Sequence, residues 1–349
     1  MTDHPTPAVI PRQVPEGTVP LIAVEGDARD CGRQYAEIVM RDYPGYRRYF
    51  DINWQFRRSL PQVRKLFERR APYMIDVLLG LTDAAGPPLS NATEPKPQTG
   101  CTSFGVSGRC TLDGQPISGQ TKDTVLESAM LYVVLRMRIN SGPTILTLAY
   151  PGEIVGYGFW STGMSLFRNS LHSKADSPSG LTLEQWAPLA LAGSSVDEAV
   201  ELAREHGLAG AGNCLIADPD GQSLSIEFNA GGIGIVPARD GIATHANHPE
   251  AEPTAPYEHY ADPVERKNSR YRMHGLWELL NAERGRLTPQ RAMMALADHR
   301  HYPRGICRHL VGDRTDRCTT AAVVAEPTRG RLHVVRSQPC CNWPVTYTL

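Results

Sequence analysis

The sequence lacks an excess of charge of either sign. Its 36 lysine and arginine residues are balanced by 37 aspartate and glutamate residues, which leaves a formal net charge of -1 at pH 7. Proteins that bind nucleic acids or anionic membranes through electrostatics carry a basic field. We therefore expect neither nucleic acid nor membrane as a partner.

Long apolar runs are also missing. The longest, Met130–Leu135 and Ile233–Ala238, fall far short of the roughly 20 residues that cross a bilayer. Residues 1–17 contain four prolines, one arginine and no continuous apolar stretch, so they lack the pattern of a secretory signal. Glycine and proline, at 31 and 28 of 349 residues, are not in the excess that marks disorder. These features predict a folded, cytoplasmic protein.

Eight cysteines are present, but a chain of this size without an export signal is expected in a reducing compartment. We therefore interpret them as free thiols. Because free cysteine is among the most buried residue types, seven of the eight can be ordinary core residues. The remaining question is whether one cysteine is a nucleophile.

The hydrophobic pattern changes near residue 100. Before it, apolar residues recur every three or four positions, which predicts helices at Ala28–Asp42, Tyr46–Phe56 and Pro61–Leu81. Residues 86–100 contain four prolines among polar residues, which predicts an exposed loop. A β-rich pattern begins directly at Cys101. We therefore divide the chain into a helical segment, 1–100, and a second segment, 101–349, within one structural domain.

The second segment alternates groups of strands with pairs of helices. Ser195 and Glu198 form a capping box for one helix, and Asp262-Pro263 and Thr288-Pro289 open two others, expected to end near Ala282 and His299. This order favours an α+β fold with antiparallel sheets covered by helices. The predicted strands are 102–106, 116–120, 130–139, 144–150, 164–168, 213–217, 223–228, 232–236, 242–246, 319–325 and 331–336.

The sharpest local feature is the pair Gly100-Cys101, where the loop meets the first strand of this segment. A cysteine thiolate there can attack the preceding carbonyl, and glycine has no side chain to block the attack and tolerates a strained backbone. Opening of the resulting thioester by water would leave Cys101 as a new N-terminus. Its α-amine, with a pKa of about 7.7–8.0 in model peptides, can then act as general base for the thiol. A buried core thiol is the simpler interpretation of this pair alone.

Several further motifs occur in the order found in one family. The sequence resembles the acyl-CoA:6-aminopenicillanic acid acyltransferase (isopenicillin N acyltransferase-like) family of N-terminal nucleophile hydrolases over nearly its whole length. The resemblance implies a four-layer αββα sandwich, a precursor cut before Cys101, and action on linear amide bonds. We expect no cofactor and no metal. The motifs are Gly100-Cys101-Thr102-Ser103, Gly119-Gln120-Thr121-Lys122-Asp123, Gly212-Asn213-Cys214, Thr244-His245-Ala246-Asn247-His248, Asn268-Ser269-Arg270-Tyr271 and Gly305-Ile306-Cys307-Arg308-His309.

The resemblance assigns roles to particular residues. Cys101 matches the cleavage site and nucleophile, and Asp123 matches an acid that holds the α-amine by a charge-assisted bond. Asn247 matches an asparagine of the oxyanion hole. Arg270 and His309 match motif positions, which we interpret as substrate-binding. The implied activity is transfer of an acyl group from a small acyl amide or acyl-CoA, through a Cys101 thioester, to water or an amine.

The sequence departs from the family at Trp160. Relatives often carry an asparagine in a Gly-x-Asn-x-x-Gly-like element, whereas residues 158–163 here read Gly-Phe-Trp-Ser-Thr-Gly. We expect Phe159 and Trp160 to form an apolar acyl pocket, because aromatic walls bury large areas, although strand aromatics also simply fill cores. Arg317 is a candidate pocket residue by position only.

Other interpretations stay open at this stage. Cys101 could pair with His245 or His248 in a Cys-His-Asn thiol protease that does not cleave itself, or the chain could be a non-catalytic binding protein on the same fold. The pairs His245-x-x-His248, His299-x-His301 and Cys307-x-His309 are scattered and include no CxxC set, so no metal site is predicted. The oligomeric state is open.

Overall fold

The computed structural model describes residues 17–43, 61–86, 100–260, 262–311 and 317–349, and these form two sheets. The larger sheet has the strand order β1-β4-β5-β6-β7-β8-β9-β10, and the smaller has the order β11-β2-β3-β12-β13-β14. Neighbouring strands are antiparallel except β1, which runs parallel to β4. The strands are β1 (Leu21–Gly26), β2 (Thr102–Val106), β3 (Ile117–Thr124), β4 (Val133–Ile139), β5 (Thr144–Ala149), β6 (Tyr157–Trp160), β7 (Ser165–Asn169), β8 (Gly212–Ala217), β9 (Ser223–Asn229), β10 (Gly232–Pro237), β11 (Ile242–His245), β12 (Cys318–Glu326), β13 (Arg331–Arg336) and β14 (Val345–Thr348).

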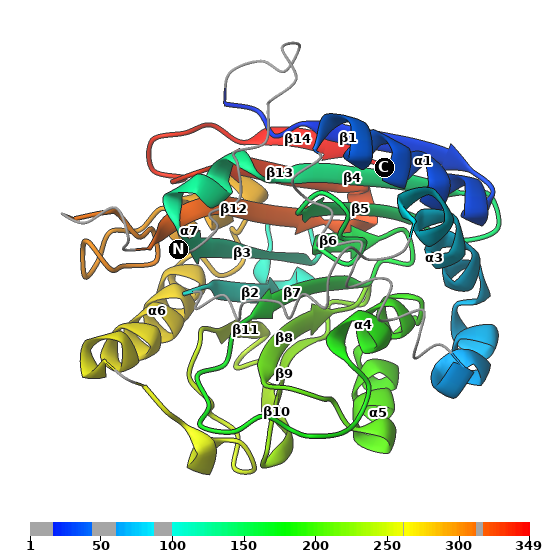
Figure 1. Cartoon of the computed structure of the whole chain (residues 1–349). Coiled ribbons are helices and arrows are strands. Elements are labelled where there is room, and N and C mark those ends of the chain that lie inside the picture. Colours follow the sequence, from blue (N-terminus) through cyan, green and yellow to red (C-terminus); the bar gives the residue numbers. More distant parts are fainter. Residues whose placement is uncertain (1–16, 44–60, 87–99, 261, 312–316) are drawn as a thin grey trace, which may run out of the picture.

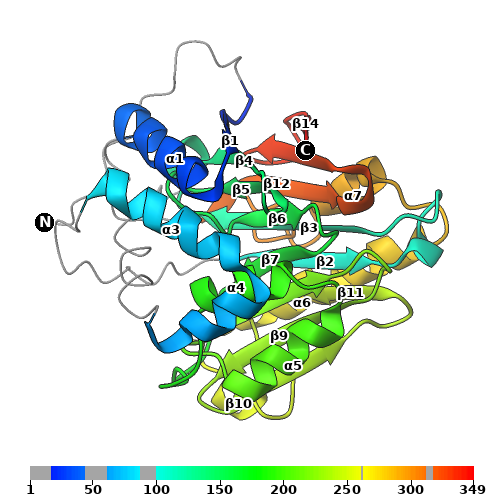
Figure 2. The ribbon, with the colours of Figure 1, turned by 90° about the vertical axis from the view of Figure 1, so that its right-hand side faces the viewer.

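Helices cover the outer face of each sheet (Figures 1 and 2). The larger sheet is covered by α1 (Ala28–Asp42), α3 (Pro72–Ala85), α4 (Leu183–Leu191) and α5 (Val196–His206), and the smaller by α6 (Pro263–Ala282) and α7 (Pro289–Leu296). Three apolar cores separate these layers: one around Trp186, one around Phe167 between the sheets, and one around Leu276. The predicted four-layer αββα sandwich is confirmed.

The segment before Cys101 differs from its prediction as an all-helical unit. It also supplies β1, a short strand that pairs with β4 of the second segment. The predicted helix 61–81 is broken at Ala71, because Pro72 has no N–H to continue the first helix and instead begins α3. The predicted helix Tyr46–Phe56 and nearly all of the predicted loop lie outside the described residues.

The most consequential strand difference concerns β3. The predicted strand stops at Gln120, whereas β3 continues to Thr124 and so places Lys122 and Asp123 inside the smaller sheet. Its neighbour β12 has a bulge between Thr319 and Ala321, opposite these residues. Strands β6 and β14 were not predicted, and α7 ends at Leu296, before the expected His299.

None of the helices within the described ranges is both long and apolar enough to cross a bilayer. The cytoplasmic location remains a prediction from the sequence.

Candidate active site

The Gly100–Cys101 peptide lies at the start of β2 and is held from both sides. The Gly100 N–H donates to the carbonyl oxygen of Asp123 at 3.0 Å, and the Cys101 N–H donates to Asn247 Oδ1 at 3.1 Å. Cys101 is fully buried. Gly100 is not among the residues with positive φ, so backbone conformation alone does not require glycine here.

Asp123 faces this peptide from the end of β3. Its Oδ1 accepts a hydrogen bond of 2.8 Å from the Thr319 hydroxyl, whereas Oδ2 has no hydrogen-bond partner among the described residues. A Cβ added to Gly100 would lie 3.5 Å from Oδ2, which places this oxygen beside the peptide. Burial raises the pKa of Asp123 to about 6, against the opposing effects of Arg272, Arg308 and the Thr319 bond. Asp123 is therefore a buried carboxyl that can change its charge near neutral pH.

Asn247 follows β11 and connects Cys101 to Arg272. Its Oδ1 also accepts a 2.7 Å bond from Arg272 Nη2, and its Nδ2 donates to the carbonyl of Ser170 at 2.8 Å. The guanidinium and the Cys101 N–H can only donate, and the Ser170 carbonyl can only accept, so this network fixes the orientation of the amide. The second hydrogen on Nδ2 has no acceptor among the described residues. Asn247 thus holds the Cys101 nitrogen and retains a donor for another group.

Arg272 was missed by the sequence analysis, which selected Arg270. Arg272 Nη1 donates to the Cys101 carbonyl at 2.7 Å and to the Thr102 hydroxyl at 2.6 Å, and the side chain is buried. Arg270 instead forms ion pairs with Glu250 and Glu258 at the surface. Helical spacing could have made this distinction, because residues 269, 272, 276 and 280 share the buried face of α6.

Lys122 is a second site residue that the sequence analysis missed. It is 4% exposed, and its ammonium donates to the Tyr157 hydroxyl at 2.6 Å. Burial would lower the pKa of Lys122, but Cys101, Tyr157 and Tyr150 together raise it above its usual value. Lys122 therefore lies within electrostatic reach of Cys101. Its place directly before Asp123 in the same motif was the available signal.

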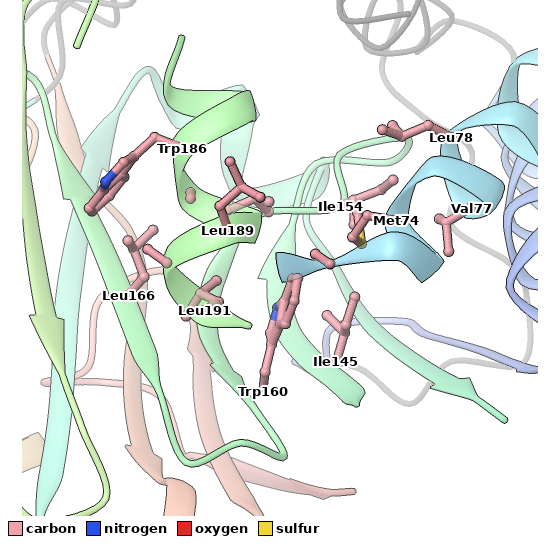
Figure 3. Close-up of a cluster of buried hydrophobic side chains, with 14 of the residues drawn as sticks. Met74, Val77, Leu78, Ile145, Ile154, Trp160, Leu166, Trp186, Leu189 and Leu191 are labelled. Carbon is pink, nitrogen blue, oxygen red and sulfur yellow. The ribbon is translucent and has the colours of Figure 1, made fainter. Parts of the chain in front are cut away.

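The two predicted aromatic pocket residues point to opposite faces of β6, as neighbouring strand residues must. Trp160 packs on the helix-covered face, near Met74 and Ile145 (Figure 3), with its ring centroid 6.4 Å from that of Tyr73. Phe159 is buried in the core between the sheets. The prediction that both line one acyl pocket is therefore wrong, and the fully buried Trp160 is a core residue that fixes α3 against the sheet.

The other two predicted substrate-binding residues lie in different surroundings. Burial lowers the pKa of Arg317, and the charge of Arg308 lowers it further. The charges of Cys101 and Asp123 raise this pKa. Arg317 therefore lies within electrostatic reach of the site. His309 contacts His299, Cys307 and Cys340 instead.

The geometry does not support a Cys-His-Asn protease. His245 Nε2 lies 2.6 Å from the carboxylate of Glu227 and Nδ1 lies 3.0 Å from the Ala246 carbonyl. His248 Nδ1 lies 2.8 Å from the Ser269 hydroxyl, and Nε2 lies 2.8 Å from Glu250 Oε1. Both ring nitrogens of His245, and Nδ1 of His248, are thus directed to groups other than Cys101, and the neighbour recorded for His248 Nε2 is Glu250, whereas a thiol base needs a ring nitrogen at the sulfur.

Comparison with known families identifies the family of this chain. A model described as "Acyl-coenzyme A:6-aminopenicillanic acid acyl-transferase" matches residues 112–339, which is more than half of the chain. The chain belongs to this family, and so to enzymes that act on acyl groups. Asp123, Asn247 and Arg272 lie inside the matched range, and Cys101 precedes it.

Two solved structures align with this chain at low sequence identity. A mutant of the conjugated bile acid hydrolase from Clostridium perfringens aligns with a TM-score of 0.48 at 10% identity, over 71% of this chain and 97% of that one. Penicillin V acylase from Agrobacterium tumefaciens aligns with a TM-score of 0.40 at 14% identity, over 68% of this chain and 83% of that one.

Proposed function

We propose that this chain is a precursor that cuts its own Gly100–Cys101 bond and becomes an amide hydrolase or acyltransferase with an N-terminal cysteine. The observation that supports this most strongly is the convergence of Asp123, Asn247 and Arg272 on that peptide. Three separate elements supply these side chains, which is more than a buried core thiol requires. Full burial of Cys101 while the bond is intact also fits a precursor whose nucleophile is not yet accessible.

In the proposed cleavage, Cys101 Sγ attacks the carbonyl carbon of Gly100. The C–N bond breaks, the Cys101 nitrogen takes up the thiol proton, and Gly100 becomes esterified to the sulfur. Water then hydrolyses the thioester to a Gly100 carboxylate and a free thiol. Asn247 Oδ1 already accepts a hydrogen bond from the nitrogen that becomes the α-amine.

In the proposed mature enzyme, the α-amine of Cys101 takes the proton from the thiol, and the thiolate attacks the acyl carbonyl of the substrate. The ionised carboxylate of Asp123 stabilises the resulting ammonium, and Lys122 stabilises charge on the sulfur. The remaining N–H of Asn247 donates to the tetrahedral oxyanion. The ammonium returns its proton to the leaving group, and water or an amine then releases the acyl group from Cys101.

The two products of cleavage, with 100 and 249 residues, are expected to stay associated. The first would remain attached through the β1–β4 pairing and through the packing of α1 and α3 on the larger sheet. Cleavage thus changes the access to Cys101 without dismantling the sandwich.

The reaction is tested by trapping the acyl-enzyme. Cleaved protein is mixed with panels of N-acyl amino acids, acylated amines and acyl-CoA donors, quenched in acid, and its larger chain is weighed. We expect at least one donor to add its acyl mass to Cys101, and hydroxylamine to remove it. Turnover of the same donor by a Cys101→Ala variant at the wild-type rate would contradict the proposed nucleophile.

A further inference from the structure

We propose that His299, Cys307, His309 and Cys340 bind one zinc ion, at a site separate from Cys101. Each side chain offers one ligand atom, and the four atoms lie within 4.8 Å of one another. No metal site is predicted from the sequence, where the histidine and cysteine pairs are scattered. The fold brings Cys340 to His299, Cys307 and His309, whereas His301 stacks on Tyr271 instead.

The three ligand distances that include His309 are close to those around a tetrahedral ion. His309 Nε2 lies 3.0 Å from His299 Nε2, 3.5 Å from Cys307 Sγ and 3.4 Å from Cys340 Sγ. Zinc bonds of about 2.0–2.1 Å to nitrogen and about 2.3 Å to sulfur separate tetrahedral ligand atoms by about 3.3–3.8 Å. The three pairs that include His309 therefore need shifts of only a few tenths of an ångström, and the remaining pairs, which lie within 4.8 Å, would close by at most about 1 Å around zinc.

The ligand types favour zinc in a structural role. Two thiolates and two imidazoles complete a four-coordinate shell and leave no open position for substrate. Soft thiolate ligands select against magnesium and calcium, which prefer oxygen. Cys307 is buried and Cys340 is exposed, so the site lies at the protein surface with access from solvent. This corrects the expectation that every cysteine other than the nucleophile is a core thiol.

The proposed ion would join three parts of the chain that are otherwise loops. His299 follows α7, Cys307 and His309 lie in the segment that leads to β12, and Cys340 lies between β13 and β14. The residue after Cys307, Arg308, donates its backbone N–H to the Thr319 hydroxyl, which in turn donates to Asp123. Zinc would therefore fix the loop whose Arg308 N–H holds the Thr319 hydroxyl that donates to Asp123.

Metal binding is measured on the full chain in the Cys101→Ala background, so that the nucleophile cannot ligate metal and the result is independent of cleavage. The protein, reduced with a phosphine, is loaded with Zn²⁺, desalted and analysed for zinc by mass spectrometry. We expect one zinc per chain, and Co²⁺ in its place should give tetrahedral d–d bands and thiolate-to-cobalt charge transfer. Cys340→Ser and His299→Ala should weaken binding at least tenfold, whereas the matched control Cys341→Ser should bind like the parent.

Two results would overturn the site. One is the absence of retained zinc and of cobalt bands in the reduced parent. The other is equal binding by Cys340→Ser and Cys341→Ser. A Cys307–Cys340 disulfide is the competing explanation for the proximity of the two sulfurs. It predicts two fewer titratable thiols before reduction and no metal uptake afterwards, and that outcome would also contradict the proposal.

Discussion

Asp123 combines complete burial with a carboxylate oxygen that has no hydrogen-bond partner among the described residues. Such a group is suited to receive an ammonium, because the new charge would replace the lost solvation. In the uncleaved chain, which has no such ammonium, the ionised carboxylate destabilises the fold. The residue therefore links the stability of the precursor to its proposed chemistry.

The stability of the uncleaved chain should show this destabilisation. The pKa of Asp123 is about 6 in the fold and about 3.9 in unfolded chains, so its contribution to stability is fully present below pH 3.9 and is lost as the pH rises through 6. In the Cys101→Ala background, Asp123→Asn should therefore raise the free energy of unfolding at pH 7 by up to about 3 kcal/mol. At pH 4 the two proteins should be nearly equal. Urea denaturation at both pH values measures this difference, and a less stable Asn variant at pH 7 would refute the burial argument.

In the active chain, the same substitution should slow both cleavage and turnover.

Asn247 is expected to act through its Oδ1, which accepts from Cys101 and Arg272, and through its Nδ2, which donates. Asn247→Ala should lower kcat about 10²- to 10³-fold, equivalent to about 2.7–4 kcal/mol, as loss of an oxyanion donor does. Asn247→Asp retains an acceptor for Arg272 and Cys101 but has no N–H. Steady-state kinetics of both variants separate the two roles. If the donor matters, the Asp variant is as slow as the Ala variant, and wild-type turnover in Asn247→Ala would remove this residue from the site.

Cys101 was selected because a glycine precedes it where a loop meets a strand, whereas Asp123 and Asn247 were selected because they match motif positions of the family that the sequence resembles. Arg270 was selected over Arg272 because the motif ended at Tyr271, although helical periodicity places residue 272 on the buried face. Lys122 was missed because the predicted strand ended too early. Trp160 was assigned to a pocket because sequence alone does not say which face of β6 is turned toward the other sheet.

At the scale of elements, α1 and α3 cross with their backbones in contact. A Cβ on Gly32 would overlap the carbonyl oxygen of Val77, and a Cβ on Gly80 would overlap that of Arg29. These glycines are required for close approach, since neither has a positive φ. The helix pair that covers β1 therefore depends on two positions without side chains.

Alanine at either glycine should separate the two helices. We expect Gly32→Ala and Gly80→Ala each to lower the free energy of unfolding by about 1–3 kcal/mol, the usual cost of overpacking. Gly275→Ala in α6 is the matched control, because its Cβ would meet nothing within 4 Å and the better helix propensity should add up to about 1 kcal/mol. Urea denaturation of the three variants gives the comparison. Equal stability of Gly32→Ala and Gly275→Ala would show that the helices are not in close contact.

Elements with strong local signals were predicted well. The helix Ala28–Asp42 has the predicted bounds, and the Ser195 cap does accept from the Glu198 N–H. The helix break before Pro72 could have been predicted from proline alone. Strands β1, β6 and β14 have only four to six residues, too few for a clear alternating pattern. Strand β1 also pairs with the distant β4, whereas β6 and β14 pair with their neighbours in the chain.

At the scale of the whole molecule, both sides of the proposed cleavage site contribute to the same sandwich. The larger sheet takes β1 from before Cys101 and the other strands from after it. The order of layers followed from the alternation of strands with helix pairs and from the family resemblance. The parallel β1–β4 pairing did not, because it joins strands separated by more than 100 residues.

The central claim is that the chain cuts itself before Cys101, and intact mass spectrometry of the purified protein tests it most directly. The wild type should give two chains of 100 and 249 residues, the second beginning Cys101-Thr102, and Cys101→Ala should give one chain of 349 residues. A wild type that stays uncut, or a Cys101→Ala variant that is cut at the same bond in a protease-deficient host, would contradict the claim.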